Sequence, residues 1–200
     1  MFLMKCLTRK DLITAYVSYD ARKKNNRIPE NIANWLWSDP NALDLELKRN
    51  NFKPGVITGY KTWQAVRLSR IDLLNCAVWN GMFRDFQSPS EHLPRVLNEL
   101  TQHPVFGRWK PNRPTEWYEW LEGGNPFPDD WPLILRPATK LEAPAKYYVE
   151  DGSGRAVCFL RRLCNYPEEN GVAMGYLGAE PDSESHFMRQ PQFRELLNLA

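Results

Sequence analysis

The segment 147–163 constrains the fold of this chain most, because it combines three backbone preferences in one short stretch. The aromatic and β-branched run Tyr147–Val149 predicts a strand. The small residues of Gly152–Gly154 then permit a tight turn. An apolar stripe within Ala156–Leu163 predicts a helix directly after it. The segment therefore predicts a strand, a glycine turn and a helix start.

A turn of this kind suits phosphate, since backbone N–H groups and the helix dipole point at one place. Gly152, Ser153 and Gly154 let an anion approach the main chain. Arg155 adds a permanent charge with forked donors, and the Ser153 hydroxyl adds another donor. These four residues are the candidate nucleotide-binding residues. The alternative is an ordinary strand-to-helix connection, in which Asp151 or Ser153 only caps the helix.

Two carboxylates, Glu150 and Asp151, immediately precede the turn. Magnesium prefers carboxylate and phosphate oxygens, so this pair is the candidate metal site for a bound nucleotide such as ATP. In a hydrolytic reaction the metal would activate water, while Arg155 would stabilise charge on the phosphoryl group. Glu150, Asp151 and Arg155 are therefore the candidate catalytic residues.

Composition excludes a chain that grips nucleic acid through its overall charge. The 26 basic and 24 acidic side chains leave a formal charge of +2, so DNA binding requires a local patch. Arg108, Trp109, Lys110 and Arg113 form such a cluster in a predicted loop, where they can touch a phosphate backbone and one base. These four are the candidate nucleic-acid residues.

The lack of a long apolar run and the dispersed cysteines and histidines favour a soluble, cytoplasmic protein. No window approaches the roughly 20 apolar residues of a membrane span. The four cysteines and three histidines are dispersed, which favours reduced structural thiols over a zinc site or disulfides. The cysteines are Cys6, Cys76, Cys158 and Cys164.

The hydrophobic pattern predicts an α+β fold in three parts: a helical extension over 1–59, a main domain over 60–180, and a tail with a short helix over 181–200. A capping box at Thr8 and Asp11 predicts the first helix. Arg161 and Arg162 are expected on the exposed side of the helix that follows the glycine turn. Strands are predicted at 62–68, 131–137, 146–150 and 172–177, and helices at 8–24, 29–37, 93–100, 117–121, after 154 and at 193–199.

The order of a proline-containing strand (Pro132–Arg136), a strand ending in Asp-Gly, and Gly-x-x-Arg-Ala at 152–156 resembles the ParB/sulfiredoxin superfamily. The resemblance implies a mixed sheet with surrounding helices and a nucleotide-binding turn at Gly152–Arg155. Sulfiredoxins carry a reactive cysteine after the turn glycine, where this chain has Ser153. ParB proteins carry an acidic residue there and an arginine next, where this chain has Ser153 and Gly154.

Because the chain departs from both sulfiredoxins and ParB proteins at the turn, it is more similar to stand-alone members of the superfamily, such as plasmid fertility-inhibition factors of the Osa type. That similarity implies ATP hydrolysis and DNA cleavage directed at DNA leaving through a conjugative type IV secretion system, with a coupling component as partner. The rival hypothesis is a catalytically silent protein that inhibits a partner through its surface, favoured by the missing acidic residue at Ser153. A third is transfer of phosphate to a small molecule, since stand-alone relatives include kinases of free amino acids.

Overall fold

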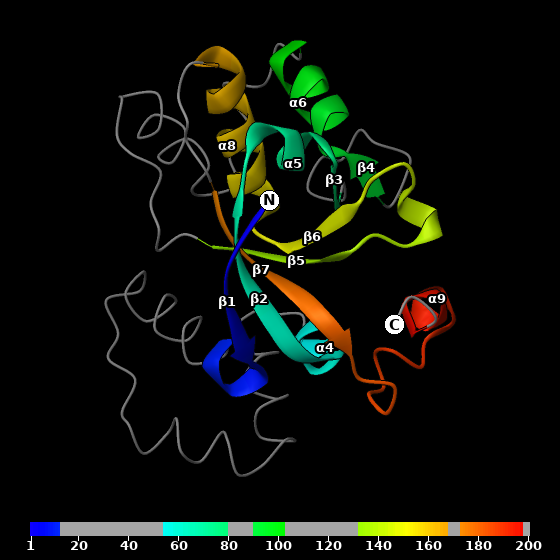
Figure 1. Cartoon of the computed structure of the whole chain (residues 1–200). Coiled ribbons are helices and arrows are strands. Elements are labelled where there is room, and N and C mark those ends of the chain that lie inside the picture. The colour runs from blue at the N-terminus through cyan, green and yellow to red at the C-terminus, as the bar shows by residue number, and fades with distance from the viewer. Residues whose placement is uncertain (13–53, 80–89, 103–131, 168–172, 198–200) are drawn as a thin grey trace, which may run out of the picture. The chain divides into compact units, whose positions relative to one another are not determined.

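The computed structural model describes residues 1–12, 54–79, 90–102, 132–167 and 173–197. Its strands form a seven-stranded sheet in the order β1-β2-β7-β5-β6-β3-β4 (Figure 1). The strands are β1 (Phe2–Thr8), β2 (Tyr60–Leu68), β3 (Cys76–Trp79), β4 (Ser90–His92), β5 (Leu133–Pro137), β6 (Tyr147–Asp151) and β7 (Ala173–Pro181). The helices are α4 (Pro54–Thr58), α5 (Arg70–Leu74), α6 (Leu93–Gln102), α8 (Ser153–Asn165) and α9 (Arg194–Leu197), with 3₁₀ turns η3 (Lys140–Glu142) and η4 (Pro191–Phe193).

The sheet mixes pairings, because β3 runs parallel to β6 and β5 parallel to β7, while β5 and β6, and β3 and β4, run antiparallel. With its several helices this is the expected α+β class. The chain divides into two compact units. The first contains Met1–Met4 and Val66–Leu177, and the second contains Lys5–Ala65 and Gly178–Ala200.

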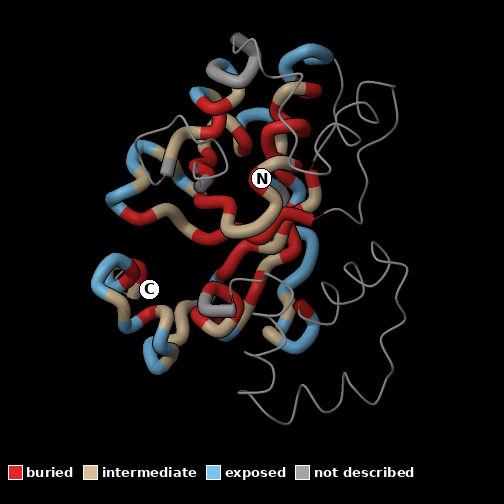
Figure 2. Tube along the Cα trace, turned by 180° about the vertical axis from the view of Figure 1, so that it is seen from behind, coloured by how far each residue is buried: buried red, intermediate tan, exposed pale blue. Residues whose placement is uncertain are grey.

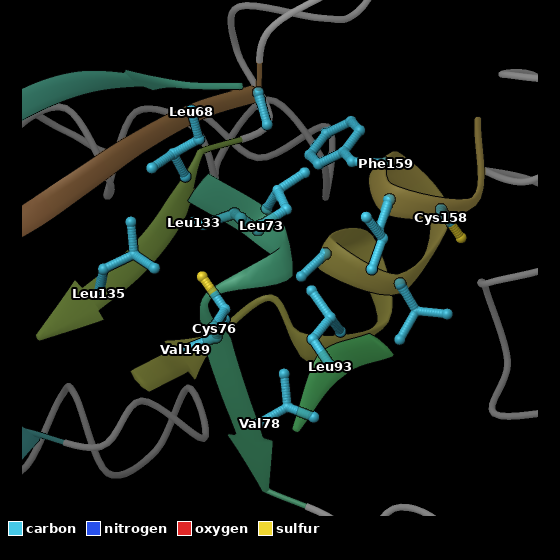
Figure 3. Close-up of a cluster of buried hydrophobic side chains, with 14 of the residues drawn as sticks. Leu68, Leu73, Cys76, Val78, Leu93, Leu133, Leu135, Val149, Cys158 and Phe159 are labelled. Atoms are coloured by element: carbon cyan, nitrogen blue, oxygen red, sulfur yellow. The ribbon is translucent and has the colours of Figure 1, made fainter. Parts of the chain in front are cut away.

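The core of the first unit lies between its strands and α5, α6 and α8 (Figure 3). Leu133 and Leu135 on β5 and Val149 on β6 contribute to it, together with Phe159 from α8. Alternate residues of a strand share a face, so this spacing commits one face of β5 to the helices. In Figure 2 buried residues form long runs through the strands, whereas exposed residues mark turns and outer helix faces.

A β-bulge interrupts the pairing of β5 with β6 just before the glycine turn. Leu135 lies opposite Val149 and Ile134 lies opposite Asp151, so Glu150 is the extra residue. Bulges bend a strand and re-aim its side chains, and they are common beside functional sites. This one lies within the predicted carboxylate pair.

Most predicted elements of the described residues are confirmed. β2, β5, β6 and β7 occupy the predicted strand positions, and α6 has Pro94 in its first turn, where the missing N–H is tolerated. The capping box is confirmed, since the Thr8 N–H donates to Asp11 Oδ2 at 3.0 Å and the Asp11 N–H donates to Thr8 Oγ1 at 3.2 Å. Residues 13–53 and 103–131, with the helices predicted there, lie outside the described residues.

Two expectations were wrong. The N-terminal extension is not helical throughout, because Phe2–Thr8 form β1. Its side chains do not alternate between polar and apolar, and Leu3 is 58% exposed, so the usual strand signal is absent. Arg162, expected in water, is only 4% exposed and its guanidinium lies 5.6 Å from the Tyr166 ring. Every helix among the described residues is too short or too polar to cross a membrane.

In the second unit, Arg9 joins segments that are far apart in the sequence. Its guanidinium donates to the carbonyl oxygens of Thr58 at 2.8 Å and Tyr60 at 3.0 Å, and to Asp182 Oδ2 at 2.9 Å. Burial raises and the Arg9 hydrogen bond lowers the pKa of Asp182, and the net effect is a lowered pKa. The ends of β2 and β7 in this unit are therefore tied to the start of the N-terminal helix.

Gly178 on β7 is required by close packing, and this yields a first prediction. A Cβ at this position would lie 2.6 Å from ring carbons of Tyr60, which is fully buried. We expect Gly178→Ala to lower the free energy of unfolding by about 1 to 3 kcal/mol, since the ring has no room to retreat. Urea unfolding followed by circular dichroism measures this. Ala179→Ser, at the exposed neighbour, is the control and should change stability by less than about 0.5 kcal/mol.

Candidate functional site

The glycine turn joins β6 to α8 through one residue with a left-handed backbone. Gly152 has φ 91° and ψ 23° and is the N-cap of α8. A Cβ there would lie 2.8 Å from Leu133 Cδ2 and equally close to Nε and Nη2 of Arg155. Both the dihedral and the space therefore require glycine. The predicted strand, turn and helix are confirmed.

The Arg155 guanidinium folds back over this turn. The side chain is only 8% exposed, and its Nη2 donates to Asp151 Oδ2 at 2.6 Å. Asp151 keeps 41% of its side chain exposed, so water reaches the acidic partner. Asp151, Gly152 and Arg155 thus lie together at the helix start.

The first turn of α8 supplies the main-chain groups that the phosphate hypothesis needs. The Ala156 N–H donates to the Gly152 carbonyl at 2.8 Å and is the first N–H of the helical ladder. The N–H groups of Ser153 and Gly154 precede it, at positions where an α-helix offers no carbonyl partner. Ser153 is 8% exposed and Gly154 is half-buried.

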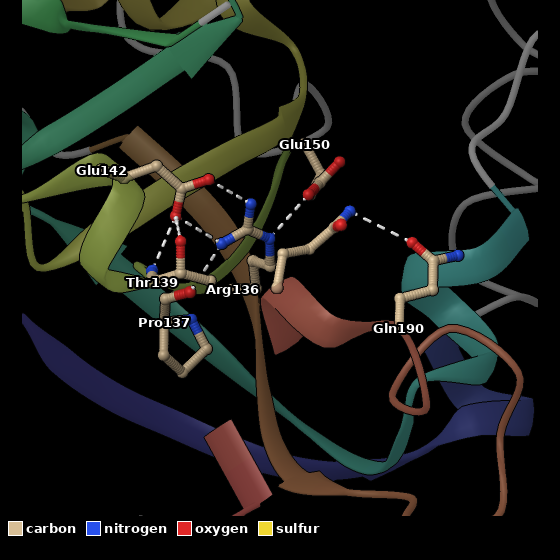
Figure 4. Close-up of polar contacts among 7 residues, drawn as sticks. Arg136, Pro137, Thr139, Glu142, Glu150 and Gln190 are labelled. Carbon is tan, nitrogen blue, oxygen red and sulfur yellow. Dashed lines mark hydrogen bonds and ion pairs between the residues drawn. The ribbon is translucent and has the colours of Figure 1, made fainter. Parts of the chain in front are cut away.

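Glu150 belongs to a different cluster, centred on Arg136 of β5 (Figure 4). Arg136 Nε donates to Glu150 Oε1 at 2.7 Å, and its Nη1 donates to Glu142 Oε2 at 2.8 Å. Glu142 also accepts from the Thr139 N–H at 2.6 Å. The guanidinium lies 4.2 Å from the centre of the Tyr148 ring. Arg136 is 3% exposed, so this is a buried ionic cluster.

The charges of this cluster sustain one another. Burial raises the pKa of Glu142. Its hydrogen bonds to Arg136 and Thr139, and the charge of Arg136, together lower that pKa by more than burial raises it, so the net effect is a lowered pKa. Burial lowers the pKa of Arg136, yet Glu142 and Glu150 raise it overall. Burial, followed by the charge of Glu150, raises the pKa of Tyr148. The ionised carboxylate of Glu142 and the charged guanidinium of Arg136 are therefore the stable forms.

The predicted metal pair does not fit a magnesium ion in this arrangement. Glu150 is paired with Arg136, and Asp151 is paired with Arg155. Within the described part of the chain, no three His, Cys, Asp or Glu side chains lie together as a metal-binding group. The magnesium assignment stays a prediction.

The other sequence-based candidates lie away from this turn or outside the description. Arg108, Trp109, Lys110 and Arg113 are outside the described residues. All four cysteines are free, and Cys76 and Cys158 are buried. Burial, with a smaller contribution from Asp72, raises the pKa of the Cys76 thiol to about 12, so that thiol stays protonated at neutral pH.

No family model, curated protein or solved structure matches the chain. Sequence reasoning missed Arg136, Thr139 and Glu142. One signal was present, since Arg136 is the only charged residue of the strand Leu133–Pro137, and a charge inside an apolar strand requires a buried partner.

Arg136→Met tests how strongly the cluster holds the first unit. Removing the guanidinium leaves Glu142 and Glu150 as buried, uncompensated carboxylates, so we expect a loss of about 3 to 5 kcal/mol in the free energy of unfolding. Urea unfolding measures it. The control is Arg95→Met, which removes an arginine whose side chain is 62% exposed and should cost no more than about 1 kcal/mol. Equal losses in the two variants would contradict a central role for Arg136.

Glu142 also predicts an acid dependence of stability. Its folded pKa lies below the ordinary value of 4.5, so its contribution is fully present above the unfolded pKa and is lost as pH falls through the folded pKa. We expect the stability difference between the wild type and Glu142→Gln to shrink as the pH falls from about 6 to about 3. Urea midpoints measured across that range check this. A difference that stays constant with pH would show that Glu142 contributes no charge-dependent stability.

Proposed function

We propose that the turn Asp151–Arg155 binds the phosphate of a nucleotide. The observation that carries this proposal is the placement of the Arg155 guanidinium directly over Gly152, where a Cβ would lie 2.8 Å from Nε and Nη2. The charge therefore stands at the helix N-terminus, beside the N–H groups of the first turn. Those are the donors that phosphate uses at such sites.

In the structure, Asp151 is paired with the Arg155 guanidinium, and we propose that a bound phosphate replaces it. Its carboxylate mimics one phosphate oxygen, since it accepts from Nη2 at 2.6 Å. With 41% of its side chain exposed, Asp151 can turn into water when a phosphate takes its place. The phosphate then takes over the neutralisation of the buried guanidinium, which is 8% exposed.

We further propose that the protein has a ParB/sulfiredoxin-like fold and acts as an ATPase or DNase. In this it would be similar to fertility-inhibition factors that block DNA transfer through a type IV secretion system. The mixed sheet and the Gly-x-x-Arg turn that follows β6 support it. The hydrolytic form would need a metal ion to activate water, and Glu150 or Asp151 could hold it only after leaving Arg136 or Arg155.

The second candidate is a protein that binds a nucleotide or a partner without catalysis. The pairing of Glu150 with Arg136 favours it, because Glu150 is then 6% exposed and committed to a buried cluster. Turnover of bound ATP distinguishes the two functions, since only the hydrolytic form releases inorganic phosphate.

Two opposite substitutions test the binding site. Arg155→Met keeps a long apolar stem and should weaken ATP binding by about tenfold or more, because charge-assisted hydrogen bonds are lost. Asp151→Asn removes the competing carboxylate and should strengthen ATP binding several-fold. Calorimetry with ATP and CTP, with and without magnesium, measures both affinities.

Arg95→Met removes an exposed arginine of α6 that pairs with Glu91 of β4, and it serves as the control, with unchanged affinity expected. A short DNA duplex titrated in parallel tests whether a phosphodiester competes. If Arg155→Met and Asp151→Asn bind ATP as the wild type does, the nucleotide site is not at this turn.

A further inference from the structure

A surface cavity of about 320 Å³ lies within the C-terminal segment, away from the glycine turn in the sequence. Met188, Arg189, Arg194 and Leu197 line it. Met188 is fully buried, Leu197 is half-buried, and both arginines are exposed. The cavity thus combines an apolar lining with two permanent positive charges. Its volume is at the small end of the roughly 300 to 1,000 Å³ of ligand sites.

The walls are held in place by local structure. The Met188 N–H donates to Ser185 Oγ at 3.1 Å, and the Arg189 N–H donates to the Ser185 carbonyl at 3.2 Å. The rings of Phe187 and Phe193 stack with centroids 4.0 Å apart. The turn that carries Met188 is therefore packed against η4, which leads directly into α9.

The two arginines are available for a ligand. Among the described residues, neither guanidinium forms a hydrogen bond or an ion pair with a carboxylate. Arg194 and Leu197 are three residues apart on α9, a spacing that places their side chains on one helix face. Arg194 and Leu197 of α9 thus line the cavity together with Met188 and Arg189 of the preceding turn.

We propose that this cavity binds a small amphipathic anion, with its anionic group between Arg189 and Arg194 and its aliphatic part on Met188 and Leu197. Guanidinium groups pair with carboxylate or phosphate oxygens in forked geometry. Methionine adapts its shape to irregular apolar ligands. The anionic group of such a ligand would pair with the arginines, and its aliphatic part would cover the apolar side chains. A purely polar anion would leave the apolar side chains exposed to water.

Octanoate is the probe that tests this site in the full chain. In titrations followed by two-dimensional ¹⁵N–¹H NMR, we expect saturable shifts of the amide signals of Met188, Arg189, Arg194 and Leu197. Acetate lacks the alkyl chain and octanol lacks the carboxylate, so each should bind at least about tenfold more weakly than octanoate. Octyl phosphate in a parallel titration distinguishes a carboxylate ligand from a phosphate ligand.

The variant Arg189→Gln/Arg194→Gln should weaken octanoate binding by about tenfold or more, because both charge-assisted contacts are lost. Arg95→Gln is the matched control on an exposed arginine, and its affinity should equal that of the wild type. Octanoate that binds the double variant equally well, or that shifts no signal around this cavity, would overturn the proposal. Arg155→Met should leave octanoate binding unchanged, so failure here is distinguishable from failure of the nucleotide site.

Discussion

The position of the glycine turn depends on the ion pairs that the buried guanidinium of Arg136 forms with Glu142 and Glu150. The Arg136 side chain is 3% exposed and must be neutralised inside the protein. Glu142 and Glu150 do this from η3 and from β6. A shift of the β5–β6 register by one residue would carry Glu150 away from Arg136 and leave buried charges without partners. The ion pair therefore specifies the register in which β6 ends at Gly152.

The bulge connects this cluster to the turn. Glu150 is the extra residue of the bulge, between Val149 and Asp151, and its carboxylate accepts a hydrogen bond from Arg136. The next residue, Asp151, reaches Arg155 instead. Neighbouring carboxylates thus serve two separate arginines. One pair is buried on both sides, at 3% and 6% exposure, and stabilises the fold, whereas the other is open to water on its acidic side and can be exchanged.

Local signals in the sequence predicted several elements, among them β2, β5, β6, β7, α6 and α8, but they predicted neither β1, β3, β4 and α5 nor the pairing of charges. The strand, turn and helix around Gly152 follow from β-branched residues, glycine and an apolar stripe. The proximity of Glu150 and Asp151 in sequence suggested a shared metal, because neither the bulge nor Arg136 as a partner is visible without the register. The burial of Arg162 was missed for the same reason, since a helical wheel does not reveal what packs against each face. The strand β1 lacked alternation and gave no signal of its own.

The Asp151 carboxylate also bears on which phosphate the proposed turn selects. It is tethered four residues before Arg155, so it competes as an intramolecular ligand at high effective concentration. A singly charged anion offers Arg155 nothing that Asp151 does not already supply. A terminal phosphate group carries about −1.5 to −2 charges at pH 7 and three acceptor oxygens, so it can engage Arg155 and the first-turn N–H groups together. A DNA phosphodiester carries one charge per phosphate and presents fewer free oxygens. Competition with Asp151 therefore favours the terminal phosphate of a nucleotide over the backbone of DNA.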